Sequence, residues 1–299
     1  YNPRGAHKAA SLPGFLGRHP LAPESVSQGH LACLHDFGYL VEVENKNILI
    51  DCGGGVFGRL LEAGLFPHQI THVIFSHLHS DHMLDYPRLI HAIWDGNNTL
   101  PKIYGPKPIK LINQRIFGKE GMLATDLIAR TELPASQEVW ISRGGNIPRP
   151  WPNPEILEID ENWNFVDGNL QIQSCLVPHA EPFLNCLGFR FDYKDKSFVF
   201  SGDSGLCQEL EHLCKNTDLL VHWCYRMSNE NDFPMISDKS PSAKQIAKMA
   251  NKAGVKTLLL THMRSHMDLD ENQLQIKQEL HDNFEGVSCV AEDLMKIKL

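Results

Sequence analysis

Three histidines and an aspartate occupy six consecutive positions of the sequence, in the order His77-x-His79-x-Asp81-His82. The chain has 16 histidines in 299 residues, so this concentration of imidazoles beside a carboxylate is unusual. Buried polar side chains need hydrogen-bond partners, and a group as dense as this has little structural use. Imidazole and carboxylate groups are ligands for divalent metal ions. The motif therefore predicts a metal site whose remaining ligands come from elsewhere in the chain.

The motif follows THVIFS (71–76), a predicted buried strand that leads directly to His77. Residues two apart in an extended segment point to the same side, so His77 and His79 face one point. The next turn directs Asp81 and His82 to a neighbouring point, and the motif can then serve two metal ions about 3.5 Å apart. Other predicted strands end at further candidate ligands: His179 in LVPHAEP, Asp203 in VFSGDSG and His262 in LLLTHM. A carboxylate can bridge two cations, which a histidine cannot do.

Strands and helices alternate along the chain and indicate an α/β protein. The predicted strands lie within 38–55, where two of them flank a polar turn, and at 71–76, 170–178, 186–193, 196–202, 218–223 and 255–262. The predicted helices follow the glycine turn at 53–55, follow Ser80, occupy two stretches of 105–133, and lie at 206–214 and 242–253. Glycines and prolines break residues 135–156, which predicts a long irregular surface segment. The candidate ligands stand at strand ends, where α/β sheets bind their ligands.

Composition and charge exclude some classes of protein. The chain is 42% hydrophobic and 21% charged, as globular proteins are. No apolar run approaches the roughly 20 residues that span a bilayer. The formal charge of −8 argues against a dedicated nucleic-acid-binding protein. Between Lys102 and Arg149, however, eight Lys or Arg residues stand against four Asp or Glu, which would favour an anionic substrate if this segment lay beside the site.

Eight cysteines are scattered along the chain without a C-x-x-C pair. This spacing fits reduced, mostly buried thiols better than a disulfide framework or a thiolate metal site. It favours a reducing compartment, and we expect a cytoplasmic protein. Without thiolate ligands, the nitrogen and oxygen donors of the motif favour zinc, with iron or manganese as alternatives.

The order of the candidate ligands resembles that of the metallo-β-lactamase superfamily, in which H-x-H-x-D-H is followed by a His, a bridging Asp and a final His. The resemblance extends from about Gly38, through IDCGGG, to the C-terminal VAEDLMKIKL. It implies an αββα sandwich, with two mixed β-sheets flanked by helices, as a single domain over 1–299 with an inserted lid-like segment at about 105–156. It also implies two zinc ions, one held by His77, His79 and His179, the other by Asp81, His82 and His262, with Asp203 between them.

Two divalent ions define the expected chemistry. A water that bridges them loses a proton near neutral pH and becomes a hydroxide nucleophile, while the same ions polarise an oxygen of the substrate. We expect Asp81 to orient this hydroxide in addition to binding metal. We expect Asp51 to support the metal loop by hydrogen bonds rather than as a ligand. No serine or cysteine nucleophile is needed.

DLLVHWCY (218–225) resembles the D-L-L-x-H-E-A-T-F phrase of the ribonuclease Z and arylsulfatase-like branch, and the segment that leads to His262 resembles a second phrase of that branch. Two departures stand out. Trp223 replaces the Glu of the first phrase, and Lys239 and Ser240 stand nearest to where the second phrase opens with His. In ribonuclease Z these residues are thought to protonate the leaving group, so their loss disfavours tRNA processing. His222 is retained as a candidate catalytic proton donor; the alternative is a structural histidine at a strand end.

The leading hypothesis is a dinuclear zinc hydrolase that acts on a small, anionic phosphodiester, sulfate or carboxylic ester. The alternatives within hydrolases are a β-lactamase or lactonase and a ribonuclease Z-like tRNA 3′-end endonuclease, so a nucleic-acid partner stays open but is not favoured. A non-catalytic metal-binding scaffold is the alternative from a different class, although a complete ligand set argues against it. The 105–156 segment is a candidate lid, and the alternatives are a solvated surface segment and a contact in a homodimer.

Overall fold

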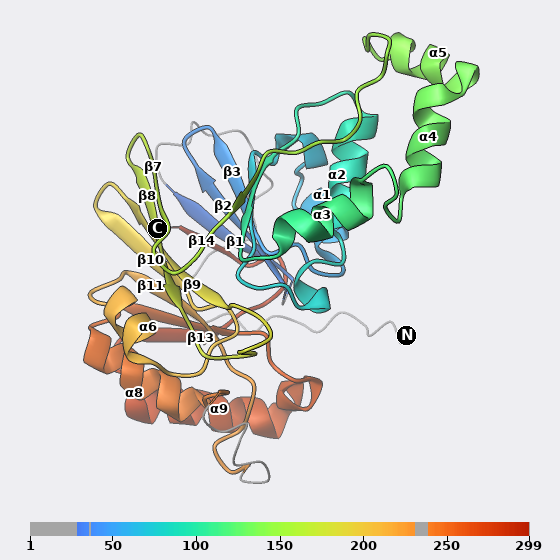
Figure 1. The fold of residues 1–299 in the computed structure, drawn as a ribbon. Helices are drawn as coiled ribbons and strands as arrows, with labels where there is room; N and C mark the ends of the chain where they lie inside the picture. Colours follow the sequence, from blue (N-terminus) through green and yellow to red (C-terminus); the bar gives the residue numbers. More distant parts are fainter. Residues whose placement is uncertain (1–28, 36, 231–238, 299) are drawn as a thin grey trace.

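Two seven-stranded β-sheets form the centre of the molecule (Figure 1). The computed structural model describes residues 29–35, 37–230 and 239–298. The first sheet has the order β14 (Lys296–Lys298), β1 (His30–His35), β2 (Gly38–Val43), β3 (Lys46–Ile50), β4 (His72–Ile74), β5 (Lys102–Gly105) and β6 (Ile156–Glu158). The second has the order β13 (Val287–Val290), β12 (Thr257–Thr261), β11 (Leu219–Trp223), β10 (Lys196–Phe200), β9 (Leu187–Tyr193), β8 (Leu170–Leu176) and β7 (Asn164–Asp167).

Each sheet is mixed. In the first, β1, β2 and β3 pair antiparallel, and β3 to β6 pair parallel. In the second, β7 to β10 pair antiparallel, and β10 to β13 pair parallel. The carboxyl ends of parallel strands meet at one edge of a sheet, so the loops that follow β10 and β12 lie at the same edge. These loops carry two of the predicted ligands.

Helices cover the outer face of each sheet (Figure 1). Helices α1 (Val56–Glu62), α2 (Tyr86–Asp95) and α3 (Ile109–Phe117) lie on the side of the first sheet, and α6 (Gln208–Leu213), α8 (Ala243–Ala253) and α9 (Asp270–Asn283) lie on the side of the second. Single 3₁₀ turns occur at η1 (Pro67–Gln69), η2 (Ser80–His82) and η3 (Ser265–Asp268). The predicted αββα sandwich is confirmed.

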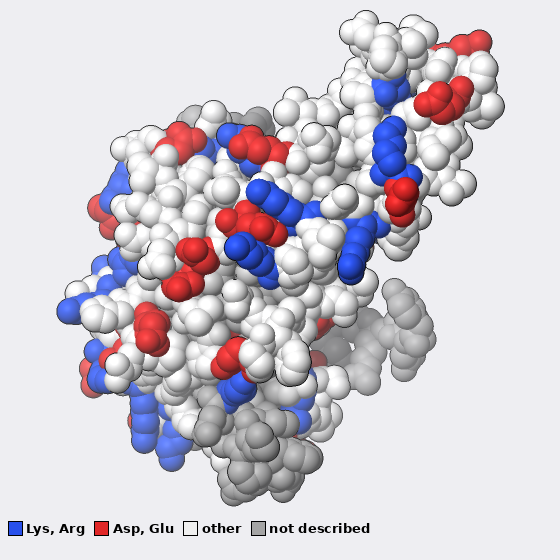
Figure 2. Space-filling view, in the orientation of Figure 1, with Lys and Arg blue, Asp and Glu red and all other residues white. Residues whose placement is uncertain are grey.

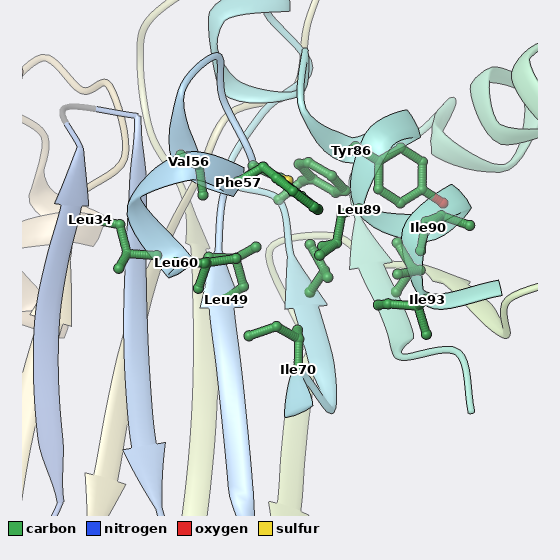
Figure 3. Packing of buried hydrophobic residues seen from close by; sticks show 14 of the residues in the cluster. Leu34, Leu49, Val56, Phe57, Leu60, Ile70, Tyr86, Leu89, Ile90 and Ile93 are labelled. Carbon is green, nitrogen blue, oxygen red and sulfur yellow. The ribbon is translucent and has the colours of Figure 1, made fainter. Parts of the chain in front are cut away.

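Apolar side chains fill three layers. Between the sheets, Leu31 and Val41 of the first pack with Phe189 and Phe198 of the second. Figure 3 shows the second layer, where Phe57 of α1 and residues of α2 such as Leu89, Ile90 and Ile93 pack with residues of the first sheet such as Leu34 and Leu49. The third layer lies between the second sheet and α8. Strands buried on both faces read as continuous apolar runs, which is why 71–76 and 255–262 were predictable.

Helix α8 shows how the sequence sets the bounds of an element. The side chain of Gln245 accepts a hydrogen bond from the backbone N–H of Ser242 at 3.0 Å, which caps the start of the helix. Gly254 ends it with φ +73°, a conformation that glycine adopts without strain. Residues on one face, among them Ile246 and Ala250, are buried against the second sheet. The predicted helix at 242–253 is confirmed.

Helices α4 (Ala124–Glu132) and α5 (Pro134–Ser142) form an arm that projects from the body beyond α3 (Figure 1). The prediction of an irregular segment over 135–156 is wrong for its first part, because α5 continues to Ser142. Pro134 stands at the first helical position, where its missing N–H costs nothing, and no breaker follows before Gly144. Residues 143–155 contain no helix or strand. The role of 105–156 as a lid stays a prediction.

Asp95, the last residue of α2, anchors this arm. Three arginines donate hydrogen bonds to its carboxylate at 2.8–3.1 Å: Arg130, Arg143 and Arg149. The guanidinium carbon of Arg149 also lies 3.7 Å from the ring centroid of Trp94 and 4.5 Å from that of Trp140. Three of the eight basic side chains between Lys102 and Arg149 are therefore engaged by one carboxylate of the body. On the face shown in Figure 2, acidic side chains stand among the basic ones of the arm and its junction with the body.

Some elements were not predicted: β1, β5, β6, β7, β13, β14 and α9. The helix predicted after Ser80 is shorter, because η2 closes after one turn and α2 begins at Tyr86. Tyr86 and Trp94 are buried in the core. Within the described part of the chain, no helix has the length and apolarity needed to cross a bilayer.

Candidate metal centre

The first group of candidate ligands consists of His77, His79 and His179. His77 and His79 lie in the loop after β4, and His179 lies in the loop after β8. Nε2 of His77 is 3.0 Å from Nδ1 of His79, which is 3.2 Å from Nε2 of His179. Three imidazole nitrogens so close together converge on one point, and three histidines form a common ligand set for a catalytic metal.

The second group consists of Asp81, His82 and His262. The 3₁₀ turn η2 carries the first two, and His262 follows β12 directly. Oδ2 of Asp81 lies 3.9 Å from Nε2 of His82 and 3.9 Å from Nε2 of His262. His262 has a φ of +52°, which is sparsely populated for a histidine and typical of residues held in place at functional sites.

Asp203 lies between the two groups. Its Oδ2 is 3.7 Å from Nε2 of His179 in the first group. The same oxygen is 3.5 Å from Nε2 of His82 and 3.3 Å from Nε2 of His262 in the second. All seven predicted ligands are therefore brought together at one edge of the sandwich, and this carboxylate has the position that a bridging ligand needs.

The unsatisfied nitrogens of the centre show that a cation fits it. Nε2 of His82 and Nε2 of His262 are buried and have no hydrogen-bond partner, which is rare for buried polar atoms. In His82 the other ring nitrogen, Nδ1, is 2.9 Å from Asp51, so Nε2 is left to face the centre. A divalent ion would satisfy both lone pairs. The donor set of nitrogen and oxygen atoms without thiolate suits zinc, and it also suits iron or manganese.

Asp51 supports the ligands from behind. Its Oδ1 accepts from the backbone N–H of Ser76 at 2.7 Å, and its Oδ2 accepts from the hydroxyl of Ser76 at 2.7 Å as well as facing Nδ1 of His82. Asp51 also lies near enough to His77 and His82 to form a metal group with them. Because both of its oxygens are already engaged, we assign it the supporting role predicted from the sequence.

Burial and neighbouring charges set the ionisation of the ligands. Burial lowers the pKa of His77 well below the usual value, so its ring is neutral and free to bind metal. Burial alone would raise the pKa of Asp203, but the facing imidazoles of His262 and His82 outweigh this and hold the pKa well below normal. Burial would likewise lower the pKa of His82, yet the facing carboxylates of Asp203 and Asp51 raise it to about 10. A metal that binds here must displace that proton.

Two aromatic rings line the centre. Phe37, in the turn between β1 and β2, packs edge-on against His262 with ring centroids 4.6 Å apart and against His82 at 5.7 Å. Trp223, at the end of β11, packs edge-on against His179 at 5.0 Å. Phe37 was not predicted and carried no signal in the sequence. Trp223 was noted only as a departure from the family phrase.

The remaining candidate residues lie outside the ligand groups. His222 is fully buried; its Nδ1 is 2.7 Å from the backbone oxygen of Trp223, and its Nε2 has no partner. Burial lowers the pKa of His222 to about 4. Lys239 pairs with Glu181 at 3.3 Å, two residues from His179.

The comparisons with known proteins agree with this geometry. The family described as Beta-lactamase superfamily domain matches residues 46–263. Ribonuclease Z of Mycolicibacterium gilvum (strain PYR-GCK) is 28% identical over 233 residues, which are 75% of this chain and 76% of that protein. The metallo-beta-lactamase fold protein YhfI from Bacillus subtilis superposes with a TM-score of 0.69 at 19% identity and covers 91% of this chain and 100% of its own. Human tRNase Z, short form, has a TM-score of 0.59 at 20% identity and covers 87% of this chain and 91% of its own.

The chain belongs to the metallo-β-lactamase superfamily. It is accordingly a metal-dependent hydrolase, as the sequence predicted.

Proposed function

We propose that the protein is a dinuclear hydrolase that uses two zinc ions to cleave a small anionic ester, namely a phosphodiester, a sulfate ester or a carboxylic ester. The position of Asp203 carries this proposal, because its carboxylate lies within 3.7 Å of ligands from both groups. Two divalent ions held by these two groups of ligands would supply an activated water and polarise an oxygen of the substrate.

The side chains have distinct roles in this proposal. His77, His79 and His179 hold one ion, while Asp81, His82 and His262 hold the other. The carboxylate of Asp81 is half exposed, unlike that of Asp203, so one of its oxygens can also face the attacking water and orient it. We also propose His222 as a proton donor in the reaction. The alternative is a structural role, in which His222 holds the end of β11 in place.

Ribonuclease activity on a tRNA 3′ end is the second candidate. It is supported by the ribonuclease Z relative that matches three quarters of the chain. Three features support a small substrate instead. The net charge is −8, the arginines of the arm are paired with Asp95, and Trp223 and Lys239 stand where the branch places its acidic and imidazole groups.

Metal analysis and a substrate panel on one sample test the proposal. Protein purified without added metal should contain about two zinc ions per chain. The panel consists of bis(p-nitrophenyl) phosphate, p-nitrophenyl sulfate, nitrocefin, an aliphatic lactone and a tRNA precursor with a 3′ extension. Preference for the first two substrates supports the proposal, and preference for the precursor replaces it with the ribonuclease. Preference for nitrocefin or the lactone indicates a β-lactamase or lactonase.

Asp203→Ala provides the decisive variant. It should lose activity by about 10³-fold or more, since each 1.36 kcal/mol of lost transition-state stabilisation is tenfold in rate. Asp192→Ala, which removes a carboxylate paired with Arg190 on the surface of β9, is the matched control and should keep full activity. Metal that is absent and cannot be restored, together with no turnover of any substrate, would leave the non-catalytic scaffold.

A further inference from the structure

Trp223 has a fixed position beside the metal centre. Its backbone N–H donates to the hydroxyl of Ser201 at 3.1 Å, and in the sheet it is paired with Thr261, the residue before His262. Strand residues alternate between the two faces of a sheet. Val221 packs between the sheets, so Trp223 lies on this same inner face, at the end of β11.

The indole ring contacts one ligand from each metal group. Its centroid is 5.0 Å from the ring of His179, with an interplanar angle of 83°, and 6.1 Å from the ring of His262, with an angle of 61°. The side chain is 5% exposed. The ring is therefore part of the wall of the centre, and water from the bulk solvent does not reach it.

Three unsatisfied polar atoms belong to residues that form or line the centre. Among the described residues, the buried side-chain atoms without a hydrogen-bond partner include Nε2 of His82, Nε2 of His262 and Nε1 of Trp223. A metal ion would satisfy the two imidazole nitrogens after displacing any proton they carry. The indole nitrogen carries a hydrogen and can only donate, so a metal ion cannot satisfy it. It needs an acceptor, and a buried donor without one is costly.

We propose that the N–H of Trp223 donates a hydrogen bond to an oxygen of the substrate anion held at the metal centre. This inference rests on the proposed function and makes Trp223 a substrate-binding residue. The Glu that stands here in the family phrase repels an anion when ionised, whereas an indole is a neutral donor that attracts one. Trp223 binds the oxygen and keeps its proton.

This donor narrows the class of substrate. A phosphate or sulfate group carries several equivalent oxygens, so one can accept from the indole while others face the metal ions. The single carbonyl oxygen of a lactone or β-lactam cannot be shared in this way. The inference therefore favours a tetrahedral oxyanion ester over the planar carbonyl substrates of the proposed function.

Nuclear magnetic resonance of the indole N–H groups tests the contact directly. The chain has five tryptophans, and the Trp223 signal of ¹⁵N-labelled, zinc-loaded protein is the one that Trp223→Phe removes. Titration with inorganic phosphate should move this signal downfield to saturation and leave the other four in place. A parallel titration with sulfate distinguishes the two anions.

Calorimetry and kinetics give independent readouts. Phosphate should bind zinc-loaded Trp223→Phe about tenfold more weakly, as expected for one hydrogen bond to a charged group. The KM for bis(p-nitrophenyl) phosphate should rise by a similar factor with a smaller change in kcat, since the bond exists before the transition state. Tyr225→Phe is the matched control, because it keeps the ring that packs on Trp223 with centroids 5.0 Å apart and removes only a hydroxyl, and it should change neither value.

The outcomes separate this inference from the proposed function. If phosphate saturates the protein and no indole signal moves, the inference is overturned. If the wild-type enzyme hydrolyses its ester and Trp223→Phe keeps the same KM and phosphate affinity, the inference fails while the function stands. If no ester is hydrolysed but the Trp223 signal moves with phosphate, the proposed function fails and the anion contact stands. The titration itself uses the wild-type protein, and Trp223→Phe serves only to assign the signal.

Discussion

The carboxylate of Asp51 lies 2.9 Å from Nδ1 of His82. It also accepts two hydrogen bonds from Ser76, the residue that precedes His77. One buried side chain therefore orients a ligand from each metal group. Its φ of +57° is unusual for an aspartate, and the three contacts keep it in that conformation. A metal-binding loop that is fixed before metal arrives loses little entropy when the ion binds.

Asp51→Asn should weaken zinc binding by about 10- to 100-fold, because the amide can no longer accept from both Ser76 and His82. Competition with a chromophoric chelator measures this affinity. Asp85→Asn is the matched control: Asp85 accepts from the backbone N–H of Gly55 and of Phe57 at the start of α1, and it touches no ligand. It should lower the free energy of unfolding and leave zinc affinity unchanged. Equal zinc affinities for the two variants would contradict the role of Asp51.

His262→Ala should reduce the zinc content from about two ions per chain to one, because the second group then keeps only two of its ligands. Elemental analysis after dialysis measures this. His266→Ala is the comparison, since His266 lies four residues later and pairs with Glu230 at 2.9 Å, outside the centre. Loss of an ion in both variants would show that the loop after β12, rather than the imidazole of His262, holds the metal.

His222 should make stability depend on pH. Burial lowers its pKa to about 4 in the folded protein, while in the unfolded chain it is about 6.5. Between these values the unfolded chain binds more protons, so stability is full above about 6.5 and falls as the pH drops towards 4. The loss is about 3 kcal/mol at most. His222→Asn keeps a donor and does not titrate, so urea unfolding at pH 7.5 and pH 5 should show a smaller loss than in the wild type.

The same variant tests the predicted catalytic role of His222. A proton donor contributes about 10²- to 10⁴-fold to the rate, so kcat should fall by that much in His222→Asn if the role is chemical. A change in stability without a change in kcat would assign His222 to the structure of β11.

Acid should release the arm formed by α4 and α5. Burial alone would raise the pKa of Asp95, but hydrogen bonds from Arg149 and Arg143 and the charge of Arg130 lower it to about 2. The stabilisation is full above the unfolded pKa near 4 and is lost as the pH falls towards 2. Because Asp95 is partly exposed, it amounts to about 1 kcal/mol. Pepsin should cut residues 118–155 faster at pH 2 than at pH 4, and Asp95→Asn should remove this difference.

Local signals predicted most of the strands and the seven candidate ligand positions, which the structure brings together, whereas the two-sheet architecture was implied by the resemblance to the family. A buried strand is an apolar run, and each ligand follows one. The arm was only half predicted, since the glycines and prolines after Ser142 masked a helix that contains none beyond its first residue. The edge strands β6, β7, β13 and β14 have only three or four residues, too few for a pattern. Phe37 lies in a turn that is far from the motif in the sequence. A contact between such distant residues produces no hydrophobic periodicity in the sequence that could have predicted it.

The two sheets contribute unequally to the centre. A single loop of the first sheet carries His77, His79, Asp81 and His82, whereas the other three ligands come from three separate loops of the second sheet. Each ion would therefore cross-link the two sheets. Zinc affinity then depends on the packing between the two sheets. A substitution in that packing layer, such as Phe198→Ala, should weaken metal binding although Phe198 contacts no ligand.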